Sequence, residues 1–181
     1  MNIRGRRKKH SRILKNVFNW LILIIIAIIV GYTFVTFLYQ TVTVVGPSMS
    51  NTLRDGQVVW VNKYVYKFRD IDRYDIVVYS KVDSDDYYEI KRVVALPEET
   101  ICIKNGNIYI DGQMLDDLPF DNSILTSGVA SNEIKLGKDE YFVIGDNVNN
   151  SEDSRYTNIG NIDKSEILGK VVHVFSSGKQ R

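Results

Sequence analysis

Residues 101–110 read ICIKNGNIYI, two short apolar segments separated by an Asn-Gly pair. Asn-Gly supplies the two positive φ angles that a two-residue turn between antiparallel strands requires. The stretch therefore predicts a β-hairpin with strands at Thr100–Lys104 and Asn107–Ile110. Asp111-Gly112 indicates a second turn soon afterwards.

A similar alternation with a period of two, broken by Gly, Asn and Asp, recurs on both sides of this hairpin. Residues 113–138 are polar and mixed and indicate a mostly irregular insertion, whereas Asp163–Leu168 indicates one short helical turn. Because no long helix separates the strands, we expect a mainly β, antiparallel domain over residues 41–181. The further strands that the pattern predicts are Thr41–Val45, Gln57–Asn62, Asp75–Tyr79, Tyr88–Ala95, Tyr141–Ile144 and Lys170–Phe175.

The chain before this domain has a different composition. Seven of the 23 basic residues lie within residues 1–15, whereas all 22 acidic residues come later, from Asp55 onward. Residues 16–53 carry no charge, and the segment WLILIIIAIIVGYTFVTFL at 20–38 is strongly apolar. A helix of roughly 20 residues spans the hydrocarbon layer of a bilayer. We therefore expect an N-terminal transmembrane anchor at residues 16–40.

The basic segment predicts the orientation of this anchor, because positively charged flanks stay on the cytoplasmic side. Residues 1–15 are then a cytoplasmic segment in contact with membrane lipid, and the β domain is extracytoplasmic. A cleaved secretory signal has a similar basic and apolar pattern, but it has a shorter apolar core followed by a small-x-small cleavage site. The apolar run here is longer and no clear site of that kind follows, which favours an uncleaved single-pass anchor.

Composition narrows the chemistry of the outer domain. Acidic residues outnumber basic ones beyond the basic segment, which argues against nucleic acid as a partner. Cys102 is the single cysteine, so an intrachain disulfide and a multi-cysteine metal site are excluded, and its isoleucine neighbours predict a small buried residue. The only histidines are His10, within the basic segment, and His173. A zinc site or a Ser-His-Asp triad is therefore not expected.

The segment GPSMSNTL at residues 46–53 follows the first predicted strand. Its Gly-Pro pair breaks that strand and presents Ser48 at a bend, where nearby backbone N–H groups can stabilise an oxyanion. Taken alone this signal is weak, because serine in a turn commonly makes a local hydrogen bond to the backbone.

The segment YYEIKRVVALP at residues 87–97 contains a lysine within a predicted strand. On a strand, Lys91 shares a mostly apolar face with Glu89 and Val93, while Arg92 points the other way. Burial disfavours the charged form of an amine, and a neutral amine is a usable general base. The alternative interpretation is that Lys91 pairs with Glu89 or is solvated.

The segment GDNVNNSEDSR at residues 145–155 is a dense polar loop after the predicted strand Tyr141–Ile144. Such a loop can satisfy its own polar groups through Asx turns and an ion pair between Asp153 and Arg155. The functional interpretation is a support that positions a catalytic amine.

The order and content of these three segments resemble the type I signal peptidases, the membrane-bound bacterial proteases that remove signal peptides from exported proteins. In that family a Ser-Met pair follows the transmembrane segment and is itself followed by Pro-Thr-Leu. Ser48-Met49 and Thr52-Leu53 match this motif, whereas Asn51 replaces the proline.

Three further motifs follow in the family order, and the resemblance runs from the anchor to about Gly169. Residues 73–78, RYDIVV, look like the family's Arg-Gly-Asp-hydrophobic motif. The family's Gly-Asp-Asn motif is matched by residues 145–155, except that Val148 replaces an arginine. The motif that carries the family's lysine base is matched by Lys91-Arg92-Val93-Val94 and Leu96-Pro97, with departures at Ala95, Glu98 and Glu99.

The resemblance implies a serine endopeptidase in which Ser48 is the nucleophile and Lys91 is the general base, with no metal or organic cofactor. The Ser48 backbone N–H is then expected in the oxyanion hole. Some family members add a serine hydroxyl at the position that Gly46 occupies here, so a backbone or water donor must serve instead.

The resemblance also implies roles for the polar loop. Ser151 matches the family serine that hydrogen-bonds the lysine amine and orients it. Asp153 and Arg155 match a supporting pair that holds the loop, and Asp146 is a further supporting candidate.

The implied substrates are exported preproteins, which family members cut after small-x-small sequences, typically Ala-x-Ala. Shallow apolar pockets lined by residues such as Val44 and Ile90 would accept those small side chains. The compact outer domain suggests a Gram-positive bacterium. The preferred preproteins and the oligomeric state stay open.

Other functions remain as alternatives. One is a membrane-tethered domain that binds peptides without cleaving them, supported by the departures at Asn51 and Val148. A self-cleaving, repressor-like Ser-Lys protease would share the catalytic logic, but it should bring a DNA-binding head, which the uncharged apolar run excludes. A eukaryote-type signal peptidase would carry histidine in place of Lys91.

Overall fold

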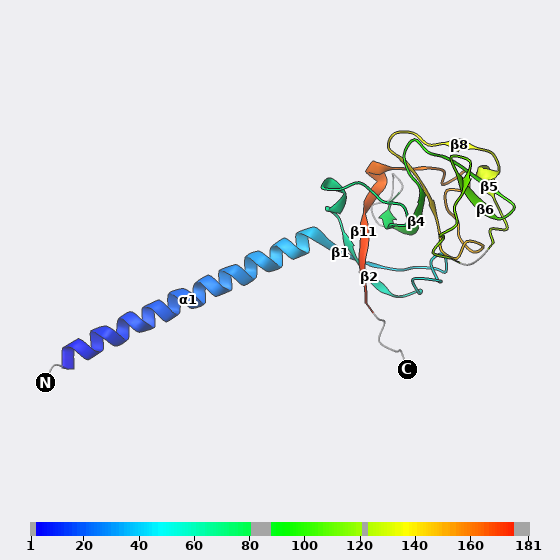
Figure 1. The fold of residues 1–181 in the computed structure, drawn as a ribbon. Coiled ribbons are helices and arrows are strands. Elements are labelled where there is room, and N and C mark those ends of the chain that lie inside the picture. The colour runs from blue at the N-terminus through cyan, green and yellow to red at the C-terminus, as the bar shows by residue number, and fades with distance from the viewer. Residues whose placement is uncertain (1–2, 81–87, 121–122, 176–181) are drawn as a thin grey trace, which may run out of the picture. The chain divides into compact units, whose positions relative to one another are not determined.

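The computed structural model describes residues 3–80, 88–120 and 123–175, with side chains from residue 15 onward (Figure 1). The chain divides into two compact units, Met1–Tyr39 and Gln40–Arg181. The first unit is a single helix, α1 (Ile3–Leu38). Its Lys15–Leu38 part, 24 residues long, is long and apolar enough to cross a membrane.

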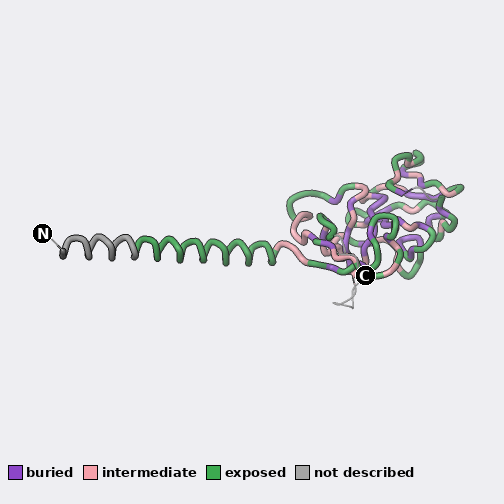
Figure 2. The backbone as a smooth tube through the Cα atoms, turned by 90° about the horizontal axis from the view of Figure 1, so that it is seen from below, coloured by how far each residue is buried: buried purple, intermediate pink, exposed green. Residues whose placement is uncertain are grey.

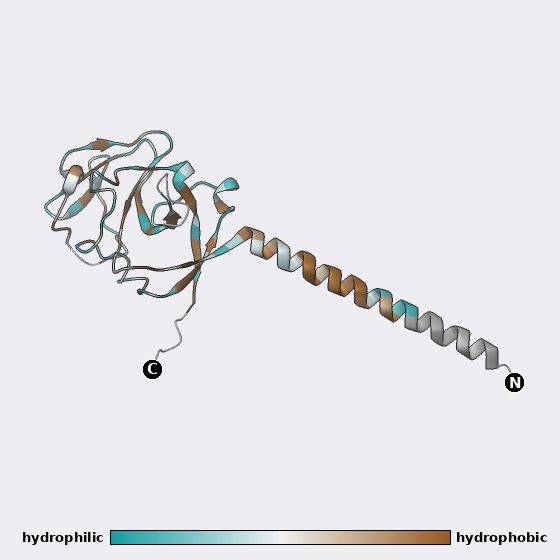
Figure 3. Cartoon of the chain, turned by 180° about the vertical axis from the view of Figure 1, so that it is seen from behind, coloured by the Kyte–Doolittle hydropathy of each residue, from teal (hydrophilic) through white to brown (hydrophobic). Residues whose placement is uncertain are grey.

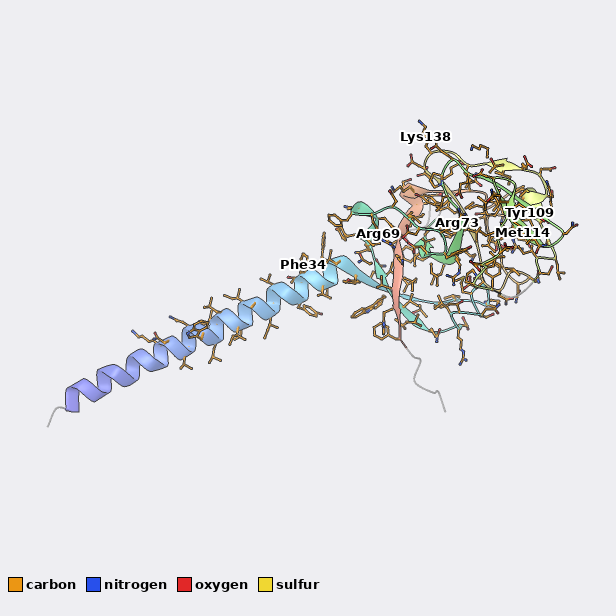
Figure 4. All side chains as sticks on the ribbon, in the orientation of Figure 1. Phe34, Arg69, Arg73, Tyr109, Met114 and Lys138 are labelled. Atoms are coloured by element: carbon orange, nitrogen blue, oxygen red, sulfur yellow. The ribbon has the colours of Figure 1, made fainter. Side chains whose placement is uncertain are left out.

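The side chains of α1 from Lys15 to Phe37 are exposed (Figure 2). They include large apolar groups such as Trp20 and Phe34, the second of which is labelled in Figure 4. The hydropathy colouring shows a hydrophobic band in the middle of this segment, with paler and hydrophilic patches on either side of it (Figure 3). An apolar helix that buries none of this surface within its own chain has the character expected of a membrane span.

The second unit is built from two antiparallel sheets, which confirms the predicted fold class. The larger sheet has the strand order β1-β2-β11-β3-β4-β9-β10, and the smaller sheet has the order β7-β6-β5-β8. The larger sheet comprises β1 (Tyr39–Thr43), β2 (Val58–Asn62), β3 (Ile76–Tyr79), β4 (Glu89–Ala95), β9 (Glu140–Ile144), β10 (Ile162–Asp163) and β11 (Ile167–Val174). The smaller sheet comprises β5 (Thr100–Lys104), β6 (Asn107–Ile110), β7 (Gln113–Met114) and β8 (Ile134–Lys135). Short 3-10 helices lie at η1 (Val65–Lys67), η2 (Gly128–Ser131) and η3 (Lys164–Glu166).

The hairpin that the sequence predicts most clearly is present as β5 and β6, with the predicted bounds. Lys104 pairs with Asn107 across the turn. Asn105 and Gly106 have φ angles of 52° and 78°, the left-handed conformation that this turn needs.

Three predicted elements differ from the structure by two or more residues: the first strand, the helical turn and the last strand, which starts at Ile167 and not at Lys170. β1 lies two residues earlier than predicted, because the chain turns away after Thr43 and leads into the bend at Gly46. The predicted helical turn at Asp163–Leu168 is shorter, since η3 ends at Glu166 and β11 starts at Ile167. A capping box between Asp163 and Glu166 fixes the start of this turn, and Ile167 already pairs with Tyr79 of β3.

Strand β4 lies in the interior of the larger sheet, between β3 and β9. Every residue of β4 after Glu89 is buried. Its apolar residues contribute to three separate core clusters: Ile90 to the one beside β2, Val93 to the one beside β10, and Val94 and Ala95 to the one beneath the smaller sheet. Charged side chains on such a strand need partners.

A candidate Ser-Lys active site

Ser48 and Lys91 lie next to each other although 43 residues separate them in the chain. Lys91 Nζ lies 3.3 Å from Ser48 Oγ, within hydrogen-bond distance. Lys91 is only 3% exposed, on β4, and Ser48 lies at the bend after β1. Both residues line a cavity of about 440 Å³ that also contacts Ser151.

The bend that carries Ser48 is held by hydrogen bonds from both of its sides. Gly46 has a φ of 84°, which favours glycine, and its N–H donates to Asp55 Oδ1 at 2.8 Å. The Ser48 carbonyl accepts from the Asn147 N–H at 2.9 Å. The Asn147 side chain donates to the Pro47 carbonyl at 3.1 Å and to Ser50 Oγ at 2.9 Å. Asn147 thus fastens the polar loop to the bend, a role that sequence reasoning did not assign.

Gly145 is the position where the polar loop and the bend come closest. A Cβ atom built there would lie 2.3 Å from Ser151 Oγ and 2.5 Å from the Ser48 carbonyl oxygen. Contacts that short do not occur, so only glycine fits. The sequence signal was a glycine at the end of a strand, which often marks a close backbone approach.

Lys91 has a second partner in addition to Ser48. Glu89 Oε2 lies 2.5 Å from Lys91 Nζ, and the two side chains form an ion pair on the same face of β4. The structure therefore shows the pairing with Glu89 that the sequence offered as the alternative interpretation, together with the proximity of Lys91 to Ser48. Ser151 is buried in the same region, and its Oγ has no hydrogen-bond partner among the residues that the structure describes. The bond from Ser151 to the amine that the resemblance implies is not formed in this structure.

Arg92 points to the opposite face of β4, as predicted, and contacts Asp146 there. Its Nε donates to Asp146 Oδ1 at 2.7 Å, and its Nη2 donates to Oδ2 at 2.6 Å. The Thr52 hydroxyl donates to the same Oδ2, and Asn51 Nδ2 donates to the Asp146 carbonyl at 3.1 Å. The asparagine that replaces the family proline therefore contributes a hydrogen bond between the Ser48 bend and the polar loop.

The polar loop is organised by the predicted ion pair between Asp153 and Arg155, which are 0% and 1% exposed. Arg155 Nε donates to Asp153 Oδ1 at 2.7 Å, and its Nη2 donates to Asp153 Oδ2 at 2.8 Å and to the Val148 carbonyl at 2.6 Å. The Gly145 N–H also donates a hydrogen bond to Asp153 Oδ2, at 3.1 Å. This pair fixes the loop from within, and the Val148 side chain is buried in the core beneath the smaller sheet.

Asp75, in the segment that resembles the Arg-Gly-Asp motif, accepts hydrogen bonds from three side chains. It accepts from the Tyr66 hydroxyl at 2.9 Å, from Arg69 Nη2 at 2.8 Å and from Lys170 Nζ. Burial, and next the Asp75 carboxylate, raise the pKa of the Tyr66 hydroxyl. This cluster joins β3 to β11 and to the segment around η1, and so stabilises the sheet beside β4.

A second, smaller cavity of about 30 Å³ also contacts the Ser48 and Lys91 pair. The pair itself forms part of its wall, and Val44 and Ile90 both line it, as expected from the sequence. Met49 and Tyr88, which sequence reasoning did not propose, line it too. The volume suits a side chain about the size of a methyl group.

A hydroxyl within reach of a buried amine, at a bend of a mainly β domain, is the arrangement of a serine hydrolase that uses lysine as its base. The sequence model of one peptidase family, described as "Signal peptidase, peptidase S26", matches residues 17–176. The chain belongs to this family.

Two bacterial signal peptidases support this assignment along nearly the whole chain. Signal peptidase I P of Bacillus subtilis subsp. natto is 35% identical over 175 residues, which cover 92% of this chain and 93% of the relative. Signal peptidase IB of Staphylococcus aureus (strain COL) is 33% identical over 175 residues, covering 87% and 88%. A crystal structure of a signal peptidase I from Enterococcus faecalis V583 is 24% identical with a TM-score of 0.46, and it covers 57% of this chain and 98% of that one.

Proposed function

We propose that this peptidase removes signal peptides from exported preproteins by means of a Ser48–Lys91 dyad, while α1 tethers it to the membrane. The observation that carries the proposal is the 3.3 Å separation of Lys91 Nζ from Ser48 Oγ inside a cavity. The family membership and the names of the relatives point to the same activity.

In the proposed mechanism, the Ser48 hydroxyl is the nucleophile. Its oxygen attacks the carbonyl carbon of the scissile bond while the uncharged Lys91 amine takes the hydroxyl proton. The oxyanion that forms is stabilised by the Ser48 backbone N–H, joined by a backbone or water donor in place of a hydroxyl at Gly46. Lys91 then gives its proton to the leaving amine, and a water molecule hydrolyses the acyl-enzyme in the same manner.

The other members of the site are assigned to support. Asp146 holds Arg92 and Thr52, and thereby keeps the Lys91 strand in register with the Ser48 bend. Asp153 and Arg155 keep the polar loop folded. We assign Ser151 to the orientation of the Lys91 amine when substrate is bound, because both residues line the larger cavity.

The substrate preference follows from the smaller cavity. Its volume of about 30 Å³ between Val44 and Ile90 leaves room for a small side chain such as that of alanine next to Ser48. We therefore assign cleavage after small-x-small sequences. Tethering by α1, with the basic N-terminal segment on the cytoplasmic side, would confine the site to the membrane surface where preproteins emerge, and so raise their effective concentration.

The test uses the full chain in detergent micelles with a preprotein that has an Ala-x-Ala site. Wild-type protein is expected to cleave after that site, whereas Ser48→Ala and Lys91→Ala should each lower the rate by about 10³-fold or more. Glu133→Gln, a change at an exposed residue near the smaller sheet, is the control and should cleave like wild type. Wild-type protein that binds several preproteins without cutting any of them would contradict the proposal and support a tethered peptide-binding domain.

A further inference from the structure

Glu89 makes the shortest polar contact of the Lys91 amine. Its Oε2 lies 2.5 Å from Nζ, whereas Ser48 Oγ lies 3.3 Å away. The Lys91 side chain is 4% exposed and that of Glu89 is 25% exposed, so the pair lies at the inner edge of the larger cavity. A carboxylate in this position stabilises the charged form of the amine, which is the form that cannot accept the proton of Ser48.

We propose that Glu89 is a positioning residue that holds the Lys91 amine in a charged resting state and so sets the pH above which the peptidase becomes active. The inference rests on the proposed function of the Ser48–Lys91 dyad and adds a control of its base. Glu89 acts only through its contact with the Lys91 amine and has no part in the attack of Ser48 on the scissile bond.

A second observation indicates where the amine goes when Glu89 releases it. Ser151 Oγ is buried, faces no hydrogen-bond partner among the described residues, and belongs to a residue that lines the same cavity as Lys91. Buried hydroxyl groups are normally hydrogen-bonded, so an orphaned one needs an explanation. A Lys91 amine that leaves Glu89 can donate to Ser151 and keep its lone pair for the Ser48 hydroxyl.

The other groups around Lys91 do not replace Glu89 as its counter-ion. From the polar loop, Glu152 and Tyr156 line the larger cavity, and Tyr88 lines the smaller one. Among the described residues, Glu89 is the acid that forms an ion pair with Lys91. The residue opposite Lys91 on β3 is the uncharged Val77.

The proton balance gives the direction of the effect. In the resting state the ammonium of Lys91 faces the carboxylate of Glu89, and activation requires that one proton leave the ammonium for the solvent at the cavity mouth. Without the carboxylate, the charged form of the amine loses its counter-ion. Removal of the Glu89 charge should therefore extend activity towards acidic pH, whereas a residue with only a structural role would lower activity at every pH.

The first experiment measures kcat/KM against pH for the full chain in detergent micelles with an Ala-x-Ala preprotein. Glu89→Gln is expected to move the acidic limb of the profile to lower pH by about one unit. Glu89→Asp keeps a carboxylate on the same face, so its limb should stay closer to that of wild type than to that of Glu89→Gln. Glu133→Gln removes a remote charge and should leave the limb in place.

Two results of this experiment would overturn the inference. One is an unchanged acidic limb in Glu89→Gln. The other is an equal shift in Glu152→Gln, which would show that any charge at the cavity mouth has the same effect.

The second experiment does not depend on catalysis. In a Ser48→Ala background, an amine-acylating reagent labels Lys91 in proportion to its uncharged fraction, and mass spectrometry of the Lys91 peptide follows the labelling against pH. Adding Glu89→Gln should lower the pH of half-maximal labelling, and an unchanged midpoint contradicts the inference. If wild-type protein cleaves no preprotein while the labelling midpoint still shifts, the proposed function fails and the control of Lys91 by Glu89 stands.

Discussion

Arg92 and Asp146 form a bidentate ion pair in the interior of the protein, with N–O distances of 2.7 and 2.6 Å. Arg92 follows Lys91 on β4, and Asp146 lies in the loop that carries Ser151. Because Asp146 also accepts from Thr52, one carboxylate joins all three segments of the site. The geometry of the Ser48–Lys91 pair therefore depends on a contact that lies on the opposite face of β4.

Asp146→Asn should destabilise the protein strongly, because it leaves the buried Arg92 without its counter-ion. Breaking a buried pair from one side typically costs about 3–5 kcal/mol of unfolding free energy. Denaturant unfolding of the full chain in micelles, followed by circular dichroism, measures the loss. The matched control is Asp72→Asn, which breaks the exposed pair with Arg69 and should cost less than about 1 kcal/mol. Equal losses in the two variants would show that the buried pair has no special role.

Gly145→Ala should lower activity much more than it lowers stability. The added methyl group would collide with Ser151 Oγ and with the Ser48 carbonyl, so the nucleophile must shift. A displacement of about 1 Å in a catalytic group can cost about 10²-fold in rate. Gly137→Ala is the control, because its methyl group meets only the flexible Glu140 side chain, at 3.2 Å. Cleavage by Gly145→Ala at the wild-type rate would be incompatible with the close packing described here.

Ile90→Ala should broaden the side chains accepted before the scissile bond. Ile90 forms part of the wall of the 30 Å³ cavity beside Ser48, and its truncation enlarges that cavity. The expected result is a higher ratio of kcat/KM for valine over alanine at that substrate position, by about tenfold, the effect of one or two methylene groups. Ile103→Ala is the control. Ile103 is buried in the core cluster beneath the smaller sheet, so its truncation should lower the stability of the protein without changing this ratio.

Much of the fold was predictable because local patterns determine it. The Asn105-Gly106 turn fixes the register of β5 and β6 from sequence alone. The start of β11 was not predictable, because Ile167 and Leu168 fit a strand and a helical turn equally well. The capping box at Asp163 fixes only the start of the turn, whereas pairing of Ile167 with Tyr79 of β3 places this residue in the strand. Tertiary contacts decide such short elements.

For the site, the sequence predicted which residues meet but not how they are connected. Ser48, Lys91 and Ser151 were proposed from a resemblance, and the structure brings them to one cavity. The hydrogen bonds of Asn147 depend on the packing of the polar loop against the Ser48 bend, 100 residues away in sequence. Val148, where the family has an arginine, is buried in the core beneath the smaller sheet, and this burial also depends on tertiary packing. Local patterns contain no information on such contacts.

Tyr66→Phe should make the unfolding free energy less sensitive to a rise in pH within the alkaline range. Burial, and then the Asp75 carboxylate, raise the pKa of the Tyr66 hydroxyl above its ordinary value of 10.0. A neutral Tyr66 therefore stabilises the folded state below about pH 10, and this contribution is lost as the pH rises further, since only the unfolded chain ionises the group. Unfolding free energies at pH 8 and pH 11 should differ less in Tyr66→Phe than in wild type. Equal differences in the two proteins would mean that folding does not suppress the ionisation of this hydroxyl.

Lys91→Arg should abolish cleavage and leave the fold intact. A guanidinium group keeps its charge throughout the working pH range, so it cannot accept the Ser48 proton. It can, however, still pair with Glu89, which is the contact that balances a buried charge at this position. The expected result is a thermal unfolding midpoint near that of wild type together with the loss of preprotein cleavage at every pH up to 10. Cleavage by Lys91→Arg would mean that a different group takes the proton. Tyr156 and Glu152, which line the same cavity, would then be the candidates.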